Sequence, residues 1–242
     1  MKKSYLFFIS AFIISVFTQN AICQTVDEVI NNHANTMGGA DKFMNIKTVK
    51  YSGQFSGDGV DIPMTMVVKR DGKAKMEMTY QGMNLIRASD GTSGWTLNPF
   101  QGGKEAQKIP AEEFKEMRKS AEIEGELINY KDKGYKAELL GKDDFEGSEI
   151  YKIKLTDKDG DVTYYLIDIS TYLILKDSKK RKVGEKEINS ETIYGNYQKV
   201  DGLMFPMSLE YIVVNSGSQK VTVEKVELNT EVDDSVFKMP VK

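Results

Sequence analysis

The chain has 242 residues, enough for one large β domain or two small ones, and its 40% hydrophobic and 29% charged content is ordinary for a soluble globular protein. Its formal net charge is −3, and its lysines and glutamates are interleaved without any basic block. A mildly acidic chain of this kind has no electrostatic basis for binding nucleic acid, so we exclude nucleic acid as a partner.

The N-terminus has the features of an export signal. Lys2 and Lys3 precede an apolar run from Tyr5 to Phe17 that only two serines interrupt, and Ala21-Ile22-Cys23 then offers small residues at the positions that a signal peptidase reads. The run is shorter than the roughly 20 apolar residues of a transmembrane helix. We therefore predict a signal peptide at residues 1–23, cleaved near Cys23, and a periplasmic protein.

Cys23 is the only cysteine of the chain and has a second interpretation. A lipid-accepting cysteine follows a leucine three residues earlier and a small residue directly before it, where this chain has Asn20 and Ile22. This context favours cleavage after Cys23, which leaves a mature chain from Gln24 without any disulfide. Lipidation of Cys23 would instead anchor the protein in the outer membrane.

The first predicted helix runs from Thr25 to Gly39. Thr25 and Glu28 have the spacing of a capping box, and Gly38-Gly39 ends the helix. His33, the only histidine, falls on the apolar stripe of this helix. A single histidine in that position is typical of a partly buried side chain with one ring nitrogen satisfied, and not of a metal ligand or a general base.

A hairpin is predicted from Ile62 to Tyr80, with Arg70-Asp71-Gly72 as its loop and Gly72 in the left-handed conformation. One face of this hairpin is entirely apolar, and the register is therefore specified, because a one-residue slip would carry the methionines into water. The pairs on that face are Val68 with Ala74, Met66 with Met76, Met64 with Met78 and Ile62 with Tyr80.

Four methionines in one cross-strand patch have two interpretations. Methionine is flexible and polarisable, so it suits a surface that repacks around different apolar partners, such as a cavity for a hydrocarbon chain. The alternative is a methionine-rich core packed under a helix. Residue types alone leave both open.

The inward face of the next strand, Leu85 to Ser89, depends on the turn at Gln81-Gly82. A two-residue turn would set Arg87 opposite Met76, on the apolar face. A three-residue turn would instead direct Ile86 and Ala88 inward, and we prefer this second arrangement because it buries no charge.

Trp95 and Phe100 follow, and either can line the rim of a pocket or fill a core. Pro110 then suits the first position of a helix that we expect to reach about Ile123. Its apolar stripe is thin, comprising Phe114, Met117 and Ala121, so we expect a mobile element. A second short helical piece is predicted from Leu127 to Lys133, before Gly134.

From Tyr135 onward the chain reads as short strands separated by turns. The predicted strands lie at 135–145, 149–157, 161–167, 172–177, 187–199, 203–214 and 220–228. Hairpin connections at this spacing favour one antiparallel sheet or barrel, and we find no linker, so we predict a single domain over residues 24–242. The concave face of such a sheet must be covered by the helices or by a ligand.

Catalytic patterns are missing from the sequence. The acidic pairs, such as Asp143-Asp144 and Asp233-Asp234, fall at turns, where aspartate is favoured for its hydrogen bonds to the backbone. Neither a nucleophile elbow nor a phosphate-binding loop occurs. We expect a protein that is not an enzyme and binds no metal or cofactor.

Several segments together resemble the LolA/LolB-like outer-membrane lipoprotein-sorting protein family, and its soluble LolA-type periplasmic carriers in particular. The hairpin turn at 69–72 resembles the Arg-Pro turn of that family, with Asp71 at the place of the proline. The other similar segments are 89–95 with Asn98-Pro99, 165–173, 197–206, and 232–237 with Pro240.

The resemblance implies a mainly β (α+β) fold: a half-open antiparallel barrel of about eleven strands with a helical lid over an apolar cavity for acyl chains. Phe114 and Met117 would lie under the lid, and Arg70 would take the lid-latching role. The residues expected to line the cavity are Ile62, Met64, Met66, Val68, Met76, Met78, Tyr80, Trp95 and Phe100.

The implied function is that of a periplasmic carrier, which shelters lipoprotein acyl chains or lipid for transfer toward the outer membrane. Its expected partners are those acyl chains, an inner-membrane release machinery and an outer-membrane acceptor, and we expect a monomer. The alternative is a non-enzymatic envelope interaction or sensor module whose own helices fill the cavity.

Overall fold

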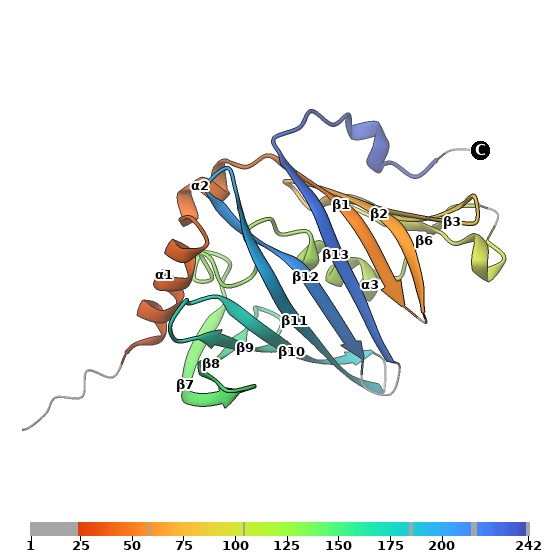
Figure 1. Cartoon of the computed structure of the whole chain (residues 1–242). Helices are drawn as coiled ribbons and strands as arrows, with labels where there is room; N and C mark the ends of the chain where they lie inside the picture. The colour runs from red at the N-terminus through yellow and green to blue at the C-terminus, as the bar shows by residue number, and fades with distance from the viewer. Residues whose placement is uncertain (1–23, 58, 104, 184–185, 214–216, 241–242) are drawn as a thin grey trace, which may run out of the picture.

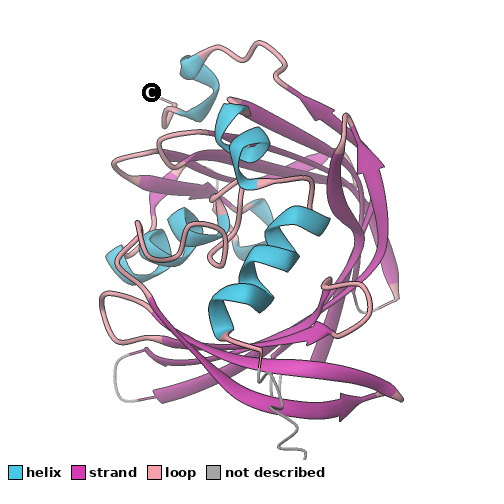
Figure 2. Ribbon diagram, turned by 90° about the vertical axis from the view of Figure 1, so that its left-hand side faces the viewer, coloured by secondary structure: helices cyan, strands magenta, loops and turns pink. Residues whose placement is uncertain are grey.

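The computed structural model describes residues 24–57, 59–103, 105–183, 186–213 and 217–240 (Figure 1). The predicted signal peptide and Cys23 lie outside these residues. The described chain is mainly β: a single curved sheet carries the helices on its concave side (Figure 2).

The described residues form one sheet of thirteen strands in which all neighbours pair antiparallel, in the order β6-β5-β4-β3-β2-β1-β13-β12-β11-β10-β9-β8-β7. β1 and β13 meet in the middle, and β6 and β7 form the two ends of this open sheet. The strands are β1 Thr48–Gly57, β2 Val60–Lys69, β3 Lys73–Tyr80, β4 Met83–Asp90, β5 Gly94–Leu97, β6 Gln107–Lys108, β7 Lys136–Phe145, β8 Ser148–Thr156, β9 Val162–Asp168, β10 Ile174–Val183, β11 Lys186–Val200, β12 Leu203–Val213 and β13 Gly217–Leu228.

The expectation of about eleven strands is therefore too low, and closure into a barrel is not confirmed. The strand that sequence reasoning missed is β6, a two-residue strand that pairs with β5 through Trp95 and Thr96. Two residues are too few to show the alternation of apolar and polar side chains that identifies a strand.

The predicted register of the β2–β3 hairpin is confirmed. Met64 pairs with Met78, Met66 with Met76 and Val68 with Ala74. The loop has three residues, and both Asp71 (φ 71°) and Gly72 (φ 73°) are left-handed. Proline cannot adopt a positive φ. A proline could therefore not take the place of Asp71 in this turn.

The next turn contradicts our preferred arrangement. Gln81 (φ 51°) and Gly82 (φ 76°) form a two-residue turn that matches the twist of the flanking strands, and Arg87 pairs directly opposite Met76. Arg87 thus shares the face of the methionines, while Ile86 and Ala88 face the other way. The charge stays solvated, because Arg87 forms an exposed ion pair with Glu113 at 3.1 Å.

The helices are α1 Val26–Thr36, α2 Ala40–Asn45 and α3 Ala111–Ser120, with short 3-10 helices η1 Pro99–Gln101 and η2 Asp234–Phe237. Thr25 caps α1 in a complete capping box with Glu28, as predicted. The helix expected from Leu127 to Lys133 is instead a series of turns, because Asn129 is left-handed (φ 55°) and interrupts the helical path.

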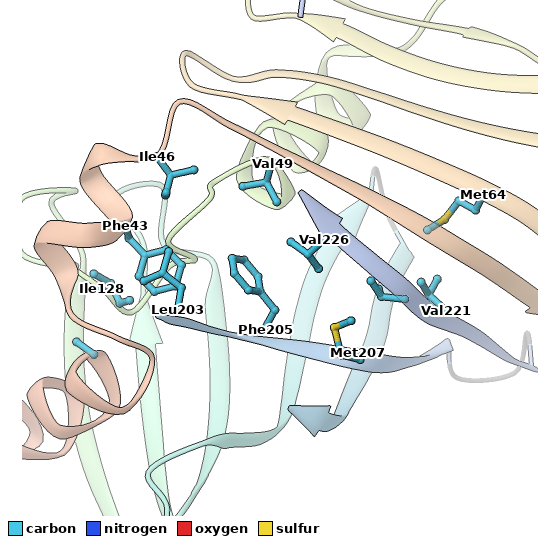
Figure 3. Packing of buried hydrophobic residues seen from close by; sticks show 12 residues of the cluster. Phe43, Ile46, Val49, Met64, Ile128, Leu203, Phe205, Met207, Val221 and Val226 are labelled. Carbon is cyan, nitrogen blue, oxygen red and sulfur yellow. The ribbon is translucent and has the colours of Figure 1, made fainter. Parts of the chain in front are cut away.

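Two apolar clusters pack the concave side of the sheet at the end where α1 and α2 lie. Figure 3 shows the first, in which Phe43 of α2, Ile46 directly after it and Ile128 approach Leu203 and Phe205 of β12. In the second, Val29 and Ile30 of α1 and Leu127 pack against strands β8 and β9, including Ile153 and Ile167. These clusters attach residues 121–134, which we call the strap, to the sheet.

Candidate functional site

The candidate site is the concave surface of β2 and β3, which we call the methionine face: Met64, Met66, Met76 and Met78. Met64 is buried in the first apolar cluster, whereas Met66, Met76 and Met78 remain half-buried. Ile62 and Tyr80, which extend this face, are half-buried as well. A thioether surface that the protein itself leaves half-covered can accept further apolar contact.

α3 lies over this face with little apolar anchorage. None of its ten residues, all of which the structure describes, is fully buried. Met117 packs near Met66 in a small cluster centred on Val68, Ala74 and Ala121. Phe114 also faces the sheet, because a Cβ added at Gly94 would lie 3.2 Å from Cδ2 of Phe114. Phe114 and Met117 are thus placed between α3 and the sheet.

Arg70 connects the helices to the strap. Its Nε donates to the Ile46 carbonyl at 2.7 Å, a terminal nitrogen donates to the Phe43 carbonyl, and the other pairs with the Glu124 carboxylate at 3.0 Å. The β2–β3 turn, α2 and the strap are therefore held together by one guanidinium group. The guanidinium group of arginine has five N–H donors in a fixed planar arrangement, so it can bind several acceptors at once.

Charged contacts also hold α3 to the turn between β8 and β9. Lys119 pairs with Asp157 at 2.6 Å and Asp161 at 3.1 Å, and Lys115 pairs with Asp159 at 2.9 Å. Burial disfavours the charged form of Lys119, but its hydrogen bonds to the two aspartates outweigh this and raise its pKa. α3 is therefore docked by ion pairs more than by apolar packing.

A cleft of about 500 Å³ opens between α3, the strap and the turns that follow β2 and β8. Charged residues dominate its lining, including Arg70, Lys115, Arg118, Lys119, Glu122 and Asp159. Such a lining does not suit hydrocarbon. The methionine face, and not this cleft, is therefore the apolar candidate surface.

The concave side of the sheet, which we call the hollow, carries polar side chains along β9, β10 and β11. Tyr165 donates to the strap residue Glu126 at 2.7 Å, and Lys179 pairs with the same carboxylate at 3.0 Å. Burial opposes ionisation of Glu126, but these two partners outweigh it and lower its pKa. Tyr194 donates to the buried Asp177, whose pKa is raised chiefly by burial. Sequence reasoning missed these polar side chains.

Trp95 and Phe100 lie apart from the other residues that were predicted to line the cavity. Trp95 does not line the hollow: it lies on the outer face, buried under the C-terminal segment, and its Nε1 donates to the Phe237 carbonyl at 2.8 Å. Phe100 is 45% exposed, with its ring centroid 6.0 Å from that of Tyr80, so it continues the apolar surface at the edge. The other seven, from Ile62 to Tyr80, share the concave face of the β2–β3 hairpin.

Metal chemistry finds no support in the described residues, where no three potential metal-binding side chains lie together. His33 is buried, with Nδ1 2.8 Å from the Tyr172 carbonyl, and burial lowers its pKa. Among the residues that the structure describes, the helices are also too short or too polar to cross a bilayer.

The fold defined by this open sheet and its inner helices is that of LolA-like proteins. A putative outer-membrane lipoprotein-sorting protein domain from Vibrio parahaemolyticus is similar, with TM-score 0.58, 12% identity, and 87% of this chain and 94% of that chain covered. A DUF1329 family protein from Desulfovibrio piger aligns with TM-score 0.61, 12% identity and coverage of 89% and 98%. A LolA superfamily protein from Nitrosomonas europaea gives TM-score 0.58, 13% identity and coverage of 89% and 98%.

The resemblance to the LolA/LolB-like family is thus confirmed as a likeness of fold. At the sequence level, residues 111–240 match a family model whose description reads "Uncharacterized protein", and the chain belongs to that family. A comparison with curated proteins finds no match.

Proposed function

We propose that the protein is an envelope carrier that binds acyl chains on the methionine face, beneath α3. The observation that carries this proposal is the incomplete cover of Met66, Met76 and Met78 by a helix that has no fully buried residue of its own. Its fold is shared with a lipoprotein-sorting protein domain, which supports a ligand of this class.

The energetics suit reversible binding. Each buried methylene contributes about 0.8 kcal/mol, so one long acyl chain can gain on the order of 10 kcal/mol before the costs of association. Displacing α3 uncovers the half-buried Phe114 and Met117 and, beneath Met117, the small buried cluster of Val68 and Ala74. The exposed ion pairs of Lys115 with Asp159 and Asp161 can be replaced by water, whereas the pair of Lys119 with the buried Asp157 is the stronger attachment.

We infer a periplasmic location and transfer of the cargo toward the outer membrane, with an inner-membrane release machinery and an outer-membrane acceptor as partners. In this account the protein acts by binding, as a monomer and without a cofactor.

The second candidate is an interaction or sensor module whose helices fill the hollow permanently. The strap favours it, because Leu127 and Ile128 are fully buried against the sheet. The two candidates differ at Met66. If the protein is a carrier, the variant Met66→Glu loses lipid binding and keeps its sheet. If the helices fill the hollow permanently, the same change unfolds the protein.

Native mass spectrometry of the protein purified from its own envelope tests the proposal. A co-purifying lipid or acylated protein supports the carrier. Repeated recovery of the bare protein from gentle preparations would count decisively against it.

A further inference from the structure

The cleft between α3 and the strap holds two cations without an acidic partner. Six basic and five acidic residues line it. Four of the acids pair with basic residues of the same lining, at 2.6 to 3.0 Å. The fifth, Asp71, is exposed and interacts electrostatically with Lys73, which lies outside the lining. Within the described part of the chain, Arg118 of α3 and Lys158 of the turn after β8 are left without a counter-charge.

Arg118 is nevertheless held in one place. Its guanidinium carbon lies over the Phe114 ring, 6.0 Å from the centroid. Its stem runs along the β2–β3 turn, where a Cβ added at Gly72 would lie 3.2 Å from Nε and 3.6 Å from Cγ of Arg118. A larger residue at position 72 would therefore press on the arginine. These contacts orient the guanidinium group, while the described residues offer no acceptor to its N–H donors.

The cleft adjoins the methionine face. Ala121 and Ile123 line the cleft and also pack in the small apolar cluster to which Met66 belongs. Arg70 and Gly72 of the lining belong to the turn of the β2–β3 hairpin, so the cleft lies at the turn end of the row of methionines. A ligand whose chain lies along that row can therefore place its head group in the cleft.

The unpaired cations select the chemistry of that head group. A phosphate monoester carries about 1.5 to 2 negative charges at neutral pH and three acceptor oxygens, and a carboxylate carries only a single charge. A guanidinium group binds phosphate through two parallel hydrogen bonds. The volume of the cleft, about 500 Å³, is typical of a small-molecule site. We propose that Arg118 and Lys158 bind a phosphate group of the acylated ligand in this cleft.

This inference rests on the proposed function, and three amphiphiles with chains of equal length test it. Dodecyl phosphate, dodecanoate and dodecanol each displace N-phenyl-1-naphthylamine from the lipid-stripped mature chain, in a low-salt buffer free of phosphate. An exposed charge-assisted contact corresponds to about three- to ten-fold in affinity. Dodecyl phosphate should therefore bind that much more tightly than dodecanol, with dodecanoate between them.

The double variant Arg118→Gln/Lys158→Gln should lose the preference for dodecyl phosphate and bind dodecanol as the unchanged chain does. Both side chains are exposed and unpaired, so the variant should fold normally. Lys199→Gln/Lys220→Gln is the matched control, because it removes the same charge. These two lysines are exposed on the convex side, opposite Met204 and Glu210, and the preference should persist without them.

The outcomes separate the inference from the proposed function. Equal affinity for dodecyl phosphate and dodecanol overturns the head-group site while the carrier function stands, and so does loss of the preference in the control variant. Dodecanoate that binds as tightly as dodecyl phosphate overturns the assignment to phosphate. Inorganic phosphate that abolishes the preference shows that the cleft takes free phosphate instead. Failure of all three amphiphiles to displace the probe overturns the carrier function, and the inference falls with it.

Discussion

The two ends of one sheet are built differently. Where α1 and the strap meet β8 and β9, the inward residues are aliphatic and sealed, as Ile153 and Ile167 show with no exposed surface. Where α3 meets β2 and β3, Val68 and Ala74 are buried beside the loop, but the methionines Met66, Met76 and Met78 stay half-buried. The alternation along the strands is the same at both ends, so the difference lies in what covers them. We infer that the sealed end maintains the fold and the other end receives the ligand.

Truncating one side chain at each end of the sheet tests this difference most strongly. Ile153→Ala should lower the free energy of unfolding by about 2–5 kcal/mol, because it opens a cavity in a sealed cluster. Met76→Ala should cost only about 1–2 kcal/mol, because a half-buried side chain loses less apolar contact. Equilibrium denaturation in urea measures both. Equal losses would show that the methionine face is ordinary core.

A second variant tests how the strap is held at each end. Arg70→Gln removes the guanidinium that joins Phe43, Ile46 and Glu124, and should cost about 1.5–3 kcal/mol, the usual range for hydrogen bonds to charged groups. Hydrogen exchange should accelerate at residues 121–125, while 126–130 stay protected by Leu127 and Ile128.

Lys50→Gln is the control for that experiment. Lys50 pairs with Glu227 at 3.8 Å on the exposed surface, a contact worth little in water. Exchange that rises equally along the whole strap in Arg70→Gln would mean that the strap moves as one unit, and would remove the distinction between its two ends.

pH offers a third test, directed at the sealed end. Burial lowers the pKa of His33 below its ordinary value of 6.5, so the unfolded chain takes up a proton there that the folded chain does not. The contribution of His33 to stability is therefore complete above pH 6.5 and is lost as the pH falls below it. Unfolding free energies of the native chain and of His33→Gln between pH 8 and 5 should converge toward low pH. Parallel curves would contradict a neutral buried histidine.

The smallest expected effect concerns Trp95. Because its ring lies on the outer face under Phe237, acyl chains brominated at mid-chain should bind without quenching its fluorescence. Trp95→Phe should cost about 1 kcal/mol through the lost hydrogen bond and leave ligand binding unchanged. Strong quenching would place Trp95 in the hollow after all.

The methionine face could be predicted from the sequence, because strict alternation of apolar and polar residues and one glycine turn define the β2–β3 register. The side of the sheet on which Trp95 lies could not be predicted, because it depends on a single turn. One residue more or less at Gln81-Gly82 moves every side chain of β4 and β5 to the opposite face of the sheet. The residue that covers Trp95, Phe237, lies 142 positions further along the chain. No local pattern could reveal that contact.

The polar side chains on the concave side of β9, β10 and β11 could not be predicted, for a related reason. The pairing of β9 with β10 shifts in register between Ile174 and Lys176, which changes the face on which Asp177 and Lys179 lie. Lysines and aspartates in a strand normally indicate a solvated face. Their burial here follows from Glu126 of the strap, which no spacing in the sequence connects to them.

The most direct test of the central claim is methyl-13C NMR of the methionines during addition of 1,2-dioleoylglycerol. We predict that the signals of Met66, Met76 and Met78 shift together as the ligand saturates, while that of the buried Met207 stays in place. Signals that do not move, or a change at Met207 as large as that at Met76, would contradict binding on the methionine face.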